Sequence, residues 1–224
     1  MSDSRSLVAP LAVVCAVGLA LFLRGSPAAA PPGRAGEDGA RYGLTAQAQA
    51  LPAAAPLRFA PAIAPSDQQI VLLAVAEARP AARRLVELVA GLVTISLNGS
   101  LPDGVAGQAR PTDDGYEVAL DLGGVYRGAG MRGVRRLVLH ELAHVVDDAL
   151  VGRALEAQLD AATPPGFGCD NGNSGGCAAR AERFAESFAK WATGDIGNDL
   201  YLGYRVPPPA SLTGWGAPLA ALTH

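Results

Sequence analysis

The sequence predicts one α+β domain that follows an apolar N-terminal helix and a flexible tether. Three observations lead to this prediction: an uncharged N-terminal stretch, a proline-rich region without periodicity, and short β-branched segments followed by longer segments of helical pattern. Strands that precede helices along a chain are typical of α+β domains. A chain of 224 residues has room for one domain of ordinary size with appendages.

The N-terminal stretch 7–23 has no charged residue and lies between Arg5 and Arg24. Its length is at the short end of the range for a membrane-spanning helix. We expect residues 1–24 to form an uncleaved signal anchor, and a signal peptide cleaved near residues 28–30 is the alternative. Both interpretations place the remaining chain outside the cytoplasm, at the cell membrane or secreted.

Residues 25–65 are rich in proline, alanine and glycine, and we expect them to form a poorly ordered tether. The folded domain is expected to span residues 66–224. Ser66 and Gln69 have the spacing of a capping box and predict the start of its first helix. The net charge of −3 gives no electrostatic reason to expect a nucleic acid as a partner.

Further elements are predicted in chain order. Pro80 should kink or restart the first helix, which ends near Gly91. The β-branched segment 92–97 predicts a strand. The segments 105–110 and 116–122 predict a hairpin across the Asp-Asp-Gly turn between them.

The second half of the domain is predicted to be mainly helical. Residues 132–150 predict a long helix, with Gly152 as its stop signal. Residues 153–178 should be dominated by loops, and residues 178–193 predict a further helix. The remaining segment is expected to be an irregular tail that packs on the domain through Tyr201, Tyr204 and Trp215.

The helix 132–150 contains the motif H-E-x-x-H as His140-Glu141-Leu142-Ala143-His144. A spacing of four residues places both imidazoles on one helix face, where they can bind a single Zn²⁺ ion. Glu141 lies beside them and can act as the catalytic base on a water molecule without being a ligand. Two imidazoles leave a tetrahedral zinc ion short of a third protein ligand.

The helix 178–193 offers that third ligand. Glu182 and Glu186 share one helix face, while aromatic residues occupy the other. We expect Glu182 to bind the metal and Glu186 to accept a hydrogen bond from a ligating imidazole. Asp147, on the same face as His144, is a second candidate for such support. The alternative for the two glutamates is a solvated stripe.

The stretches 137–148 and 181–191 resemble the gluzincin metallopeptidases, in particular the catalytic domain of anthrax-lethal-factor-like proteases. The shared features are H-E-x-x-H and a later E-x-F-A-E-x-F. The resemblance implies a small zincin-like domain with a short mixed sheet, whose edge strand, here 116–122, aligns a peptide substrate. It also implies that the zinc ligands are His140, His144 and Glu182. Glu186 would support one of these ligands.

The expected function is therefore zinc-dependent hydrolysis of peptide bonds in a peptide or protein substrate. The lethal-factor type has a tyrosine shortly before its second motif that stabilises the oxyanion, and here the stretch 171–179 contains none. Tyr126, Tyr201 or Tyr204 could supply that hydroxyl. The alternative is a catalytically weak or inactive surface protein of the same fold that acts as a binding module. A structural metal site, or none, is a further alternative.

Cys169 and Cys177 flank a short loop rich in glycine and asparagine. Outside the cytoplasm, two cysteines in this arrangement are expected to form a disulfide bond. Free thiols or metal ligands are the alternative in a reducing compartment. A calcium site in 170–176 is a weaker interpretation, because the spacing does not match an EF-hand loop.

Overall fold

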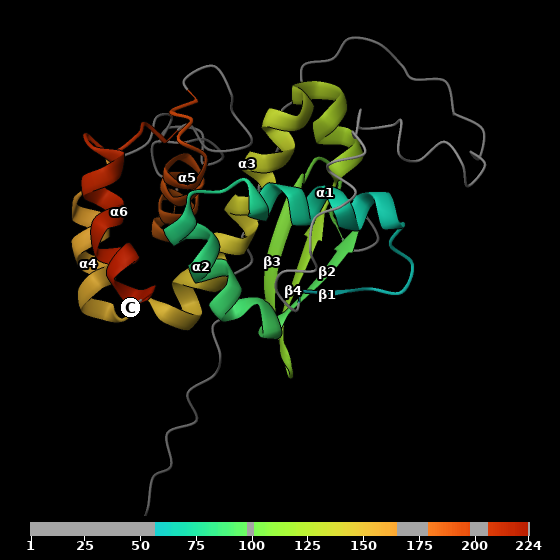
Figure 1. The fold of residues 1–224 in the computed structure, drawn as a ribbon, viewed down its shortest axis with the longest axis horizontal. Coiled ribbons are helices and arrows are strands. Elements are labelled where there is room, and N and C mark those ends of the chain that lie inside the picture. The colour runs from blue at the N-terminus through green and yellow to red at the C-terminus, as the bar shows by residue number, and fades with distance from the viewer. Residues whose placement is uncertain (1–56, 98–100, 165–178, 198–205, 224) are drawn as a thin grey trace, which may run out of the picture.

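A computed structural model describes most of the predicted domain (Figure 1). The expected anchor, most of the tether, the Cys169–Cys177 pair and Tyr201 and Tyr204 lie outside the described residues. Within the described part of the chain, no helix is both long enough and apolar enough to cross a bilayer. The described ranges are 57–97, 101–164, 179–197 and 206–223.

The four-stranded sheet is mixed, which confirms the predicted α+β class. Its strands are β1 (Arg58–Phe59), β2 (Val93–Leu97), β3 (Gly107–Thr112) and β4 (Gly115–Leu120). Their order is β1-β2-β4-β3, with β4 parallel to β2 and antiparallel to β3. β1 pairs with β2 and Leu57 is buried, so residues that were expected in the tether contribute to the sheet and the core.

The predicted hairpin is present, but its edge assignment is wrong. β3 and β4 pair from Gly107 opposite Leu120 to Thr112 opposite Gly115. The segment expected at the edge forms β4, which lies inside the sheet, and the edge strands of the described sheet are β1 and β3. A tight turn makes two strands neighbours but does not decide which one is outermost; the long-range pairing of β4 with β2 decides it.

The first two helices begin at prolines. α1 (Pro65–Ala76) has no side-chain cap, so the predicted capping box at Ser66 is wrong. Proline is favoured at the first helical position, where its missing N–H has no partner to lose. α2 (Pro80–Val89) is a separate helix, so Pro80 restarts the helical path as predicted. It continues into η3 (Ala90–Leu92).

The later part of the chain is more helical than predicted. The remaining helices are α3 (Leu122–Leu150), α4 (Arg153–Ala161), α5 (Arg180–Thr193), α6 (Leu212–Ala220) and the 3₁₀ turn η6 (Ala221–Thr223). α4 occupies the first part of the expected loop, and α6 forms in the expected irregular tail. Figure 1 shows the sheet on one side and α4, α5 and α6 on the other, with α3 between them.

Tertiary packing explains why α6 forms despite two glycines and Pro218, which lower its intrinsic helix propensity. Ser211 caps its first turn by accepting a hydrogen bond from the Gly214 N–H at 3.0 Å. Trp215 is buried and donates through Nε1 to Thr163 Oγ1 at 3.0 Å. The predicted packing of Trp215 on the domain is therefore confirmed.

α3 begins at Leu122 rather than at Arg132, and Gly130 divides it into two helical segments. Gly130 has φ 61° and ψ −163°, and apart from its own chain neighbours and helix backbone no described atom would lie within 4 Å of a Cβ placed there. Only glycine adopts this backbone conformation readily. The kink directs the second segment, from Met131 onward, between the sheet and α5, where its apolar residues are buried.

Gly130→Ala should destabilise the fold through backbone conformation alone, because the added methyl group meets no neighbour. We expect a loss of about 1–3 kcal/mol in the free energy of unfolding, measured by urea denaturation. Gly91→Ala is the matched control, since its Cβ also meets no atom and its φ lies outside the left-handed region. Equal stability of the Gly130 variant and the wild type would show that this kink is absent in solution.

Candidate metal centre

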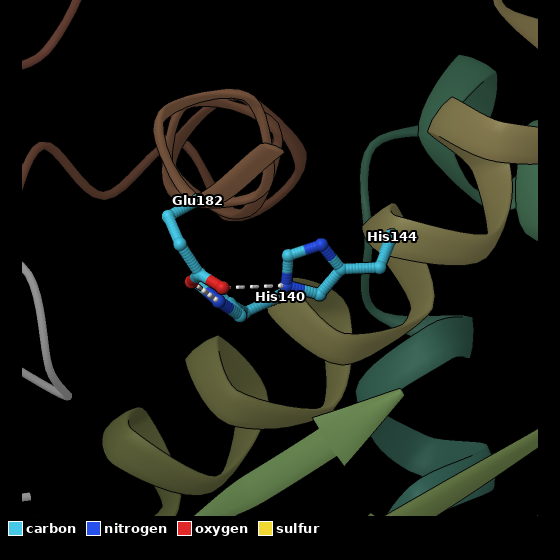
Figure 2. Close-up of side chains that lie close together, drawn as sticks. All are labelled: His140, His144 and Glu182. Carbon is cyan, nitrogen blue, oxygen red and sulfur yellow. Dashed lines mark hydrogen bonds and ion pairs between the residues drawn. The ribbon is translucent and has the colours of Figure 1, made fainter. Parts of the chain in front are cut away.

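Three side chains from α3 and α5 meet at one point (Figure 2). Glu182 Oε2 lies 3.1 Å from His140 Nε2, and Glu182 Oε1 lies 3.6 Å from His144 Nε2. One candidate ligand atom from each residue lies within 4.8 Å of the other two. Donor atoms around one tetrahedral zinc ion are about 3–4 Å apart. This group of residues could therefore bind a metal ion.

The carboxylates around the two imidazoles favour positive charge at this point, and His140 would release its proton on binding a metal ion. Burial lowers the pKa of His144 to about 4, and its Nε2 atom has no hydrogen-bond partner within the described residues. Burial also opposes a charge on His140, but the hydrogen bond with Glu182 and nearby carboxylates outweighs it and raises the pKa to about 9. The group thus offers one neutral ring nitrogen and a carboxylate that favours positive charge beside it.

Glu141 is fully buried and is not part of the three-residue group. Burial raises the pKa of Glu141 to about 8, and Glu182 adds to the rise, while His140 and the Ala109 backbone N–H oppose it. Even so, neither carboxylate oxygen makes a hydrogen bond of normal geometry with the described part of the chain. Burying a carboxylate without such bonds lowers the stability of the fold, and groups of this kind are common at functional sites.

Two ion pairs flank the group and set the register of α3 against α5. On one side, Arg136 Nη2 donates to Glu186 Oε2 at 2.7 Å, and both side chains are almost completely buried. On the other side, Arg180 donates to both carboxylate oxygens of Asp147, at 3.0 and 2.7 Å. The two helices therefore run antiparallel, and Glu182 lies opposite the imidazole pair.

These pairs correct the roles expected of Glu186 and Asp147. In the described structure, Glu186 binds Arg136 and lies 3.8 Å from Lys190 Nζ, and Asp147 binds Arg180. In that structure, neither carboxylate accepts a hydrogen bond from an imidazole. Because the helices are antiparallel, one turn beyond Glu182 on α5 corresponds to one turn before the imidazoles on α3. Glu186 and Asp147 thus fix the ligands indirectly, through the helices.

Sequence reasoning missed the arginine partners of these carboxylates. Arg136 lies one turn before His140, and Glu186 lies one turn after Glu182, which is the charge pattern of two antiparallel helices. That pattern is visible in the sequence. It indicates the Arg136–Glu186 ion pair only when the two helices are known to be neighbours. Of the three tyrosines considered for the oxyanion, only Tyr126 is described; it lies in α3 before the kink and packs partly buried on the core.

Comparison of the chain with protein-family models, with curated proteins and with solved structures finds no match. The assignment of a candidate metal centre therefore rests on the convergence of His140, His144 and Glu182.

Glu182→Gln should weaken metal binding while keeping the size of the side chain. With Zn²⁺ as the test ion, we expect more than ~100-fold weaker binding. Loss of a residue that only hydrogen-bonds to a metal ligand already lowers metal affinity about 10–100-fold, and loss of a ligand should cost more. Metal content after dialysis and calorimetric titration measure the effect. Glu87→Gln, at a surface ion pair, is the control and should bind like the wild type. Unchanged retention in the Glu182 variant would remove this residue from the ligands.

Glu186→Gln should destabilise the fold, since it leaves Arg136 without its buried anionic partner. Removing one member of a buried ion pair costs about 3–5 kcal/mol, whereas the exposed pair of Glu87 should contribute about 0–1 kcal/mol. Equal losses in the Glu186→Gln and Glu87→Gln variants, measured by urea unfolding, would contradict the buried pair.

The same variant carries a pH signature. Burial alone would raise the pKa of Glu186, but the charges of Arg136 and Lys190 outweigh it and lower the pKa below its ordinary value of 4.5. A lowered folded-state pKa stabilises the fold above the unfolded-state pKa, and this stabilisation is lost as pH falls through the folded-state pKa. The stability difference between wild type and Glu186→Gln should therefore shrink in acid.

Proposed function

We propose that this chain is a zinc-dependent peptidase, with His140, His144 and Glu182 as the metal ligands and Glu141 as the catalytic base. The observation that supports this proposal is the convergence of a buried carboxylate from α5 on the two imidazoles of the H-E-x-x-H helix. Two imidazoles and one carboxylate form a donor set typical of catalytic zinc sites, which keep a fourth position open.

A bound zinc ion would supply Lewis-acid chemistry, acidifying a water molecule and polarising a scissile carbonyl group. Glu141 accepts the proton of the attacking water at its carboxylate and later delivers it to the leaving amine. The burial that raises its pKa to about 8 without a metal also excludes competing water. A cation between the imidazoles and Glu182 would lower this pKa toward neutrality, where Glu141 can both accept and donate a proton.

The edge strand β3 supports a peptide as the substrate class. β3 starts beside Glu141 and, among the described residues, pairs on one side only, with β4. An extended peptide can hydrogen-bond to the free side of such a strand, as in β-strand addition. In the proposed function, β3 therefore takes the substrate-aligning role expected of 116–122. The predicted anchor in residues 1–24 would hold the enzyme at the membrane with this site outside the cytoplasm.

Glu141→Gln separates catalysis from metal binding. We expect zinc content equal to that of the wild type and a loss of at least about 10²–10⁴-fold in the cleavage rate, the usual contribution of a general base. The substrate is a peptide library digested with and without 1,10-phenanthroline, with products read by mass spectrometry. Turnover that persists in Glu141→Gln would exclude this mechanism. A zinc-loaded wild type without chelator-sensitive products would favour the binding-module alternative.

A further inference from the structure

Gly107 and Glu141 are in direct contact across the interface between β3 and α3. Gly107 is the buried first residue of β3. A Cβ atom at this position would lie 2.5 Å from Glu141 Oε1, 2.7 Å from its Cγ and 2.8 Å from its Cδ. Contacts this short do not occur in folded proteins, so a side chain at residue 107 and the observed position of the Glu141 side chain exclude each other.

The backbones on both sides of this contact are held in place. Gly107 pairs with Leu120 in the hairpin, and the Asp121 N–H donates to the neighbouring Ala106 carbonyl oxygen at 2.8 Å. On α3, the residues that follow Glu141, Leu142 and Ala143, are fully buried. A methyl group at residue 107 would therefore be accommodated by rotation of the Glu141 side chain, the one flexible group in the contact.

We propose that Gly107 is a positioning residue for the catalytic base. By having no side chain, it leaves the space in which the Glu141 carboxylate lies beside the imidazole pair. This inference rests on the proposed function, and it adds a determinant on an edge strand, outside the set of metal ligands. The three nearest atoms to a Cβ at residue 107 all belong to Glu141 and none to a ligand.

Gly107→Ala should therefore affect chemistry without affecting metal binding. We expect kcat to fall about 100-fold, since a displacement of about 1 Å of a catalytic group can cost that much. Zinc affinity should equal that of the wild type. Gly91→Ala is the matched control, because its Cβ meets no atom within 4 Å, and it should retain full activity. A loss of zinc binding in Gly107→Ala would contradict a role through Glu141 alone.

A double-mutant cycle tests the contact without any activity measurement. Urea unfolding midpoints are compared for the wild type, Gly107→Ala, Glu141→Ala and the double variant. Gly107→Ala should lower the midpoint in the wild-type background. In the Glu141→Ala background it should leave the midpoint unchanged or raise it, because the clash is gone and alanine restricts the unfolded chain.

The outcomes separate the two proposals. Additive midpoint shifts would overturn the Gly107 inference whether or not the chain is an enzyme. An active wild type with an equally active Gly107→Ala variant would also overturn it, and would leave the peptidase proposal intact. A zinc-loaded wild type that cleaves nothing would overturn the peptidase proposal, and the positioning role with it, while the midpoints would still report on the contact.

Discussion

The antiparallel register of α3 and α5 is the constraint on which the candidate site depends. An α-helix turns by about 100° and rises 1.5 Å per residue, so a slip of one residue would carry Glu182 away from the imidazoles. The register is set by the buried Arg136–Glu186 pair on one side and by the Asp147–Arg180 pair on the other. Such pairs add little net stability, because desolvation offsets the attraction, but a wrong register would leave their charges unpaired.

Two kinds of buried polar group therefore occur side by side in this molecule. Those that set the register have partners within the chain, and their charges are neutralised. At the centre of the site, His140 and Glu182 share a hydrogen bond, but His144 Nε2 and the Glu141 carboxylate lack hydrogen bonds of normal geometry within the described residues. The apolar core on the other faces of α3 offsets the cost of keeping them buried, and a cation bound by the imidazoles and Glu182 would offset it further.

Much of the fold could be predicted because its determinants are local. Pro80 restarts a helix, β-branched residues form β2, and the Asp-Asp-Gly turn joins β3 to β4 as predicted. The errors are places where distant contacts override local preference. α6 forms on α5 in spite of its glycines and proline, and β4 rather than β3 joins β2, so the edge strand is not the one predicted.

The sequence by itself determined that His140 and His144 share a helix face with Glu141 beside them, because helical periodicity is a local property. It also made Glu182 a reasonable candidate for the third ligand. Only the tertiary structure decided that Glu182 meets both imidazoles, that Glu186 and Asp147 bind arginines instead, and that Gly107 contacts Glu141. These contacts depend on how separate elements pack, and packing geometry is not encoded in the spacing of residues within any one element.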